Sequence, residues 1–418
     1  MTTTRTIWTL AVVVIAAGLA GGCDTLFGSK SSDTTDEIFE AGRNEPGLIN
    51  EAEYVALFPF FSQAGDGGTL QQPQDIYVGY DEFIYIVDAR GLHVLDLAGR
   101  AANFIPIPGG GTSVIQDRRL DVYVTARRDT VLEGRTWNLP VVLHYADITV
   151  GAPRLVDIIW HPFDDDSRKF NLPDPLDTDE QVEFTGVAIL ANNNIFVSRR
   201  GPINDRTSVI LPHNTVLEFS KDGVNTQAIV ALNPARASVR SSLFPADVMT
   251  FVHPPQRDRF SDAKHFVVAQ NGPAGAPLQF SVLSILAVVT SDGIEYRPDT
   301  QRLTVSTNPE RGDGFLYDEF KFERPTDLMY AADASNYWFV LDGGKDSLFV
   351  FTNAAVEGVA PPPGSNSTKP VVVSFGGTGD GALQFRNPNG VAYYDRVVYV
   401  ADTGNNRISR FKLNTDFE

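Results

Sequence analysis

The chain has 418 residues, of which 43% are hydrophobic and 21% charged, and its formal net charge is −18. Nucleic-acid binding depends on clustered Lys and Arg, so this charge argues against a nucleic-acid partner. Cys23 is the only cysteine, which excludes a disulfide within the chain and any thiol chemistry in the residues that follow it. The folded part must therefore be stabilised by a hydrophobic core, and this length and composition can supply one.

The N-terminus has the pattern of a targeting segment, which we assign to residues 1–22. Arg5 is followed by an apolar run from Ile7 to Ala20, and small residues then precede Cys23. The run is shorter than the roughly 20 residues that a membrane-spanning helix needs. It resembles a bacterial lipoprotein signal, which implies acylation of Cys23 and anchoring to a lipid bilayer of the cell envelope. An ordinary secretory signal or an uncleaved anchor is the alternative.

Residues 23–51 are polar and poor in large apolar side chains, which predicts a flexible tether. From residue 52 the pattern changes to short β-branched and aromatic runs, broken by Gly, Pro, Asn and Asp. No long helical period occurs there. This pattern predicts one all-β domain, a propeller or a sandwich, over residues 52–418.

A repeat decides between these two architectures. The stretch FRNPNGVAYYDRVVYVADTGNNRISRFKL (385–413) recurs in similar form at residues 71–97 and 323–351. It resembles the NHL repeat, a unit that builds the blades of β-propellers, and internal repetition of this kind defines a fold. Six second strands can be aligned, which predicts a six-bladed β-propeller; they fall at residues 83–88, 121–126, 194–199, 265–270, 337–342 and 397–402.

A second internal match predicts how the ring closes. LFPFFSQAGDGGTLQQP (57–73) resembles VVSFGGTGDGALQFRNP (372–388), whose first part is the outer strand of one blade. The chain ends just after the third strand of blade six, so that blade lacks an outer strand of its own. We therefore expect residues 54–61 to complete it, which would remove an exposed sheet edge.

Three acidic residues occupy one place at the start of three inner strands. These are Asp75, Asp247 and Asp327, which should meet near the mouth of the central channel. Carboxylates suit a hard cation, so the trio is a candidate Ca²⁺ site. A resemblance to the lactonase-like six-bladed propellers would imply a calcium ion at a comparable place in the channel. The Glu and Asn positions of their motif are not recognisable in this sequence. The alternative is structural: each Asp accepts backbone N–H groups in its own turn.

Two long loops between second and third strands are predicted on the same face, at residues 126–140 and 199–212. They offer Arg127, Arg128, Arg199 and Arg200 as ligand-binding residues, with Trp137 as a stacking platform. The alternative is that these Arg side chains are solvated or paired with the abundant acids.

The same repeat places three further Asp residues directly after second strands. Asp88, Asp342 and Asp402 are expected to stabilise the tight loops that follow.

The motifs favour binding over catalysis. Peptide-amidating lyases, which resemble this family, hold zinc with channel histidines, but none of the six His residues here opens an inner strand. The leading interpretation is a membrane-anchored, non-enzymatic propeller that binds a protein or carbohydrate partner in the cell envelope. The alternative is a Ca²⁺-dependent enzyme, similar to lactonases or lyases, with its site at the channel mouth.

Overall fold

The structure is a computed structural model. It describes residues 52–132, 134–162, 178–204, 212–229, 244–256, 264–273, 278, 280–303, 314–362 and 368–417. The predicted signal peptide, Cys23 and the tether lie outside these residues, as do parts of the predicted loops. Within the described ranges no helix is long and apolar enough to cross a membrane.

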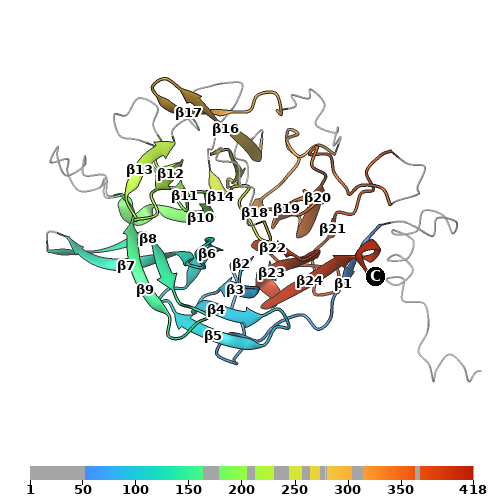
Figure 1. The fold of residues 1–418 in the computed structure, drawn as a ribbon, viewed down its shortest axis with the longest axis horizontal. Helices are drawn as coiled ribbons and strands as arrows, with labels where there is room; N and C mark the ends of the chain where they lie inside the picture. Colours follow the sequence, from blue (N-terminus) through green and yellow to red (C-terminus); the bar gives the residue numbers. More distant parts are fainter. Residues whose placement is uncertain are drawn as a thin grey trace, which may run out of the picture. The chain divides into compact units, whose positions relative to one another are not determined.

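Strands dominate the described part of the chain and form six antiparallel, four-stranded sheets (Figure 1). The sheets surround a central channel as the six blades of a β-propeller, as predicted. Blades one to three consist of β2 (Asp75–Val78), β3 (Phe83–Val87), β4 (Gly91–Asp96) and β5 (Ala101–Pro106); β6 (Gly111–Gln116), β7 (Val122–Leu132), β8 (Arg135–Ala146) and β9 (Arg154–Trp160); and β10 (Glu183–Ile189), β11 (Ile195–Arg200), β12 (Thr215–Phe219) and β13 (Asn225–Ile229).

The remaining three blades follow the same order from the channel outward. They consist of β14 (Pro245–Met249), β15 (Phe266–Gln270), β16 (Val282–Thr290) and β17 (Gly293–Pro298); β18 (Pro325–Tyr330), β19 (Trp338–Asp342), β20 (Ser347–Phe351) and β21 (Phe375–Gly376); and β22 (Gly390–Tyr394), β23 (Val397–Asp402), β24 (Arg407–Leu413) and β1 (Tyr54–Ala56).

The core lies between neighbouring blades. The second strands are almost wholly buried, because each sheet is covered on both faces by its neighbours. Phe196 of blade three meets Phe266 of blade four with ring centroids 4.9 Å apart. Aromatic and β-branched side chains fill such sheet-to-sheet interfaces well, which explains why these residue types dominate the repeats.

The last blade is completed by the N-terminal strand, as predicted. Tyr54 pairs with Leu413 and Ala56 pairs with Phe411. Beyond the strand, the N–H of Leu57 donates to the carbonyl of Arg410 at 2.8 Å. The matching segment at Phe375 pairs with β20 as the outer strand of blade five, which confirms the internal match.

One predicted loop is instead a hairpin. Residues 126–140 were expected to be a long loop, but β7 and β8 continue their pairing out to Leu132 and Arg135. Thr130, Val131 and Thr136 are β-branched, and polar and apolar residues alternate in Thr136–Asn138, which suits a two-stranded ribbon. Gly134 takes a positive φ of 80° at the turn, a conformation that glycine adopts without strain.

The closure makes a prediction about stability. A chain that starts at Ala52 should melt cooperatively, whereas one that starts at Gln63 should aggregate or lack a cooperative transition. The shorter chain loses β1 and exposes the edge of β24. Thermal denaturation followed by circular dichroism measures both. A soluble, cooperative melt of the shorter chain would contradict the closure.

Candidate functional site

The inner strands place one equivalent residue from each blade around the channel. The register against the second strands identifies these ring positions as Asp75, Ser113, Gly186, Asp247, Asp327 and Gly390. The three predicted Asp residues therefore do meet at the channel. They line its narrow bore, about 30 Å³ of open space, rather than its mouth. That space is too small for an organic ligand.

Each carboxylate also accepts a hydrogen bond from a backbone N–H of a neighbouring blade. Asp75 accepts the N–H of Val114 in blade two at 2.8 Å, and Asp327 accepts the N–H of Val391 in blade six at 2.6 Å. The other oxygen of Asp75 and of Asp327 accepts the N–H of the following residue at 2.7 Å. This arrangement matches the structural alternative for the trio.

Two ring positions are glycine because an adjacent carboxylate fills the space. A Cβ on Gly390 would lie 2.6 Å from the Cα of Asp75, and a Cβ on Gly186 would lie 3.0 Å from the Cα of Asp247. Carboxylates and glycines in the ring are thus complementary in size.

The carboxyl groups also perturb one another. Burial raises the pKa of Asp75 to about 7, and the charge of Asp247 adds to the rise although the Val114 N–H opposes it. Burial likewise raises the pKa of Asp247 to about 6, and burial followed by the charge of Asp247 raises the pKa of Asp327 well above its usual range.

A calcium ion needs six to eight oxygen ligands around one point. Both oxygens of Asp75 and of Asp327 already accept backbone N–H groups. Among the described residues no group of three or more His, Cys, Asp or Glu side chains is arranged to hold a metal ion. Calcium at this trio stays a prediction, and no step of the function proposed below uses it.

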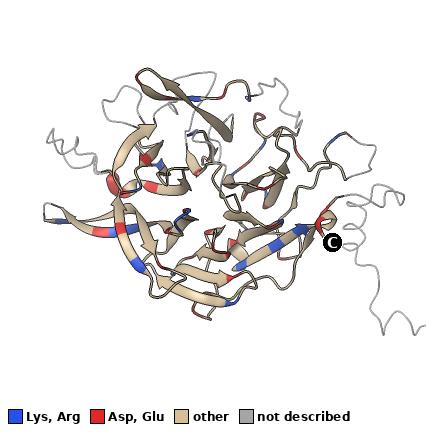
Figure 2. Cartoon of the chain, viewed as in Figure 1, with Lys and Arg blue, Asp and Glu red and all other residues tan. Residues whose placement is uncertain are grey.

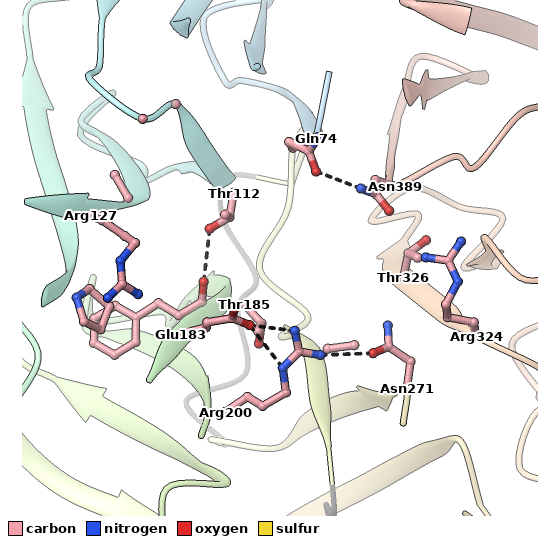
Figure 3. Close-up of a pocket in the computed structure, with 16 residues that line it drawn as sticks. Gln74, Thr112, Arg127, Glu183, Thr185, Arg200, Asn271, Arg324, Thr326 and Asn389 are labelled. Atoms are coloured by element: carbon pink, nitrogen blue, oxygen red, sulfur yellow. Dashed lines mark hydrogen bonds and ion pairs between the residues drawn. The ribbon is translucent and has the colours of Figure 1, made fainter. Parts of the chain in front are cut away.

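The mouth of the channel is a wider cavity of about 500 Å³ (Figure 3). Its floor is formed by the residue that precedes each ring position, so that all six blades contribute: Gln74, Thr112, Thr185, Ala246, Thr326 and Asn389. The amide of Asn389 donates to the amide oxygen of Gln74 at 2.8 Å, which joins blades six and one across the closure. The floor therefore presents hydroxyl and amide groups at fixed positions.

Arginine side chains from three blades line the wall above this floor. Arg200 donates to Glu183 at 2.6 Å and to the amide oxygen of Asn271 at 3.2 Å, so its charge is compensated (Figure 3). Among the described residues Arg127 binds uncharged acceptors alone, the carbonyls of Val182, Glu180 and Asn138 and the side-chain oxygen of Asn138. Burial lowers the pKa of Arg127, an effect that Glu183 and Glu180 oppose.

Arg324 forms the fewest hydrogen bonds of the three to described residues. Its Nη2 donates to the carbonyl of Gly343 at 2.5 Å and to the side-chain oxygen of Asn387. A guanidinium carries five N–H donors. The Nε and both Nη1 donors of Arg324 thus have no acceptor among the described residues, and it forms no ion pair with them.

The other predicted ligand-binding residues lie outside the cavity. Arg128 follows Arg127 in strand β7, so its side chain lies on the opposite face of the sheet. Burial raises the pKa of Tyr145, and the charge of Arg128 opposes that rise. Arg199 is buried and donates to the carbonyl of His213 at 2.9 Å. Trp137 is only 5% exposed, and the guanidinium of Arg135 lies 3.9 Å from its ring centroid. Neither Trp137 nor these two Arg side chains line the mouth.

The three Asp residues after the second strands are structural, as predicted. Asp88 accepts the N–H groups of Gln71 and Arg90 at 2.8 and 2.7 Å. Asp342 accepts the N–H of Glu323 at 2.8 Å, and Asp402 accepts that of Arg386 at 2.8 Å. Each fully buried carboxylate therefore joins the loop before its inner strand to the turn after its second strand.

Sequence reasoning missed Arg324, Glu183 and Asn271. Arg324 is separated from the predicted loops by more than a hundred residues and stands directly before the Pro325 that opens its inner strand. Its position in the repeat could have identified Arg324 as a mouth residue, because the segments that lead into the inner strands form the mouth.

Comparison with known proteins supports the fold. The NHL repeat family matches residues 385–411. A Bacteroides thetaiotaomicron structural genomics protein of unknown function is 13% identical with a TM-score of 0.50, and the alignment covers 87% of this chain and 77% of that one. An auxiliary nutrient binding protein from the same organism (10%, 86% and 72%, TM-score 0.48) and virginiamycin B lyase from Staphylococcus aureus (11%, 87% and 99%, TM-score 0.42) are also similar. No curated protein sequence gives a significant match.

The chain is thus a six-bladed β-propeller that carries an NHL repeat in its last blade. At 13% identity, the similarity to the structural genomics protein shows that the two chains share a fold and nothing beyond it.

The buried trio predicts a pH-dependent stability. Because the pKa of Asp75 rises from 3.8 to about 7 on folding, the folded chain binds its proton more tightly than the unfolded chain. The Asp75 contribution to the free energy of unfolding should therefore fall as pH rises from about 4 to about 7, by on the order of 3 kcal/mol. Asp75→Asn should flatten that decline in urea denaturation curves. Asp222→Asn, at an exposed turn, is the control, and equal pH slopes for wild type and Asp75→Asn would contradict the argument.

Proposed function

We propose that this protein is a non-enzymatic binding module, anchored in the cell envelope by lipid on Cys23, whose mouth cavity holds an anionic polar ligand. An acidic carbohydrate matches the cavity best. The uncommitted guanidinium of Arg324, above a floor of hydroxyl and amide groups, is the observation that carries the proposal.

The composition of the mouth favours binding over catalysis. Among the described residues, those that line it include no His, Cys, Ser or Lys, and their one carboxylate, Glu183, is paired with Arg200. A nucleophile activated by an adjacent base would need at least two such groups within hydrogen-bond reach of each other. The cavity also lies within the size range of small-ligand sites.

The charge of the mouth favours an anion. Arg200 and Glu183 compensate each other, whereas the acceptors that Arg324 and Arg127 bind within the described part of the chain are all uncharged. A guanidinium fork recognises a carboxylate or phosphate through two parallel hydrogen bonds. The hydroxyl and amide groups of Thr326, Asn389 and Gln74 would then serve the neutral hydroxyls of a sugar.

Lipid anchoring follows from the N-terminal pattern rather than from the site. Small residues before a lone cysteine are typical of the position where a bacterial lipoprotein is cleaved and acylated. A tether of residues 23–51 would separate the propeller from the bilayer, so that a partner in the envelope could reach the mouth.

Replacing Arg324 tests the ligand site. Trigalacturonate should bind the wild type in isothermal titration calorimetry, and Arg324→Gln should weaken it about tenfold, because a charge-assisted hydrogen-bond pair is lost. The neutral trisaccharide maltotriose should bind less tightly than trigalacturonate to the wild type and should be insensitive to the substitution.

Arg154→Gln is the matched control, since Arg154 lies on the outer strand of blade two and pairs with Asp147. Equal affinities of the Arg324→Gln and Arg154→Gln variants for trigalacturonate would refute the assignment of Arg324. Melting temperatures of both variants show whether any loss reflects unfolding.

Replacing Cys23 tests the anchor. In a bacterial host, wild-type protein should sediment with membranes and incorporate labelled palmitate, whereas Cys23→Ser should do neither. One acyl chain adds about 0.8 kcal/mol of membrane affinity per buried CH₂ group, so loss of the lipids should release the protein. Membrane retention of unlabelled Cys23→Ser protein would indicate an uncleaved anchor instead.

A further inference from the structure

A second cavity of about 360 Å³ lies at the other end of the inner strands. The mouth is formed where β18 and β22 begin, whereas this cavity is formed after they end, by residues 333–337 and 395–396. Tyrosines from β1, from β22 and from the loop before β19 line it, and we call it the tyrosine pocket: Tyr54, Tyr393 and Tyr337, with Asp333, Asp395, Arg396 and Asp416. It is therefore separate from the site at the mouth.

The tyrosine pocket contains a phenol hydroxyl without a hydrogen-bond partner among the described residues. Tyr54 is 4% exposed, and its hydroxyl makes no hydrogen bond to any described residue. Tyr393, by contrast, donates to Asp333 at 2.6 Å, and Tyr337 accepts the N–H of Ala360 at 3.3 Å. The hydroxyl of Tyr54, a residue that lines the cavity, has no hydrogen-bond partner among the described residues, so it is available to a ligand there.

The charge of the pocket is negative. Three carboxylates face one cation, and that cation, Arg396, is already 3.4 Å from an oxygen of Asp416. Burial raises the pKa of Tyr54, Tyr337 and Tyr393, so the phenols remain neutral and keep their hydroxyl protons. Two negative charges are left without a positive partner among the described residues of the lining.

Aromatic faces beside excess carboxylate are the environment that organic cations prefer. A primary ammonium adds three N–H donors, which suit the carboxylate of Asp333 or Asp395 and the unpaired oxygen of Tyr54. An anion would be repelled by the same carboxylates. We propose that the tyrosine pocket is a second binding site, which takes the primary ammonium group of a small ligand.

Titration with n-butylammonium chloride, followed by calorimetry and by tyrosine fluorescence, tests the site. The wild type should bind the probe, whereas sodium butyrate should not bind there. Asp395→Asn should weaken n-butylammonium about fivefold, and Arg396→Gln should strengthen it about threefold, since each substitution changes the local charge by one.

Tyr54→Phe removes only the hydroxyl and should weaken the probe while leaving the β1 pairing in place. Arg324→Gln is the matched control, because it alters the mouth and should leave the ammonium affinity unchanged. This control also separates the two sites: a failure of trigalacturonate binding does not affect the result here.

Two outcomes would overturn the proposal. The first is a wild type that binds n-butylammonium no better than it binds butyrate. The second is an affinity that does not change, or that changes in the same direction, in Asp395→Asn and Arg396→Gln. Melting curves identify any variant that does not fold. The affinity of the variant that does fold then decides whether the local charge controls ammonium binding.

Discussion

Pairing of β1 with β24 is the contact on which the rest of the structure depends. Blade six takes three strands from the C-terminus and one from residues 54–56, so the two ends of the domain are locked together. The mouth depends on the same contact, since Asn389 of blade six bonds Gln74 of blade one and Gly390 makes room for Asp75. An open ring would separate these pairs and divide the cavity floor.

Around the ring, one polar contact recurs with different side chains. The hydroxyls of Thr112, Thr185 and Thr326 each donate to a carbonyl at the start of the next blade, at 3.0, 3.2 and 3.1 Å. Blade four has Ala246 at that position, and Asn271 supplies the bond instead. A backbone carbonyl at the start of an inner strand needs a hydrogen-bond donor. Every one of these four carbonyls therefore has one, although the donor residue differs between blades.

The fold was predictable because the repeat is an aligned pattern of whole strands, and the closure followed from a second match within it. The site was only partly predictable. Adjacent residues of a strand point to opposite faces, so Arg127 and Arg128, like Arg199 and Arg200, could not both face the mouth. Alternation could have separated them once 126–132 was recognised as strand. Arg324 and Asn271 come from other blades, and only the closed ring brings them to Arg200.

The net charge of −18 makes the chemistry of the mouth informative. Charged residues of both signs are interspersed over the blades (Figure 2), and most Arg side chains near carboxylates form ion pairs. At the mouth, Arg324 and Arg127 are held by carbonyl and amide oxygens instead, which fix the guanidinium groups without cancelling their charge. Orientation by neutral acceptors leaves a cation available to a ligand, whereas a paired carboxylate would first have to be displaced. That difference separates Arg324 from Arg200, although both line one cavity.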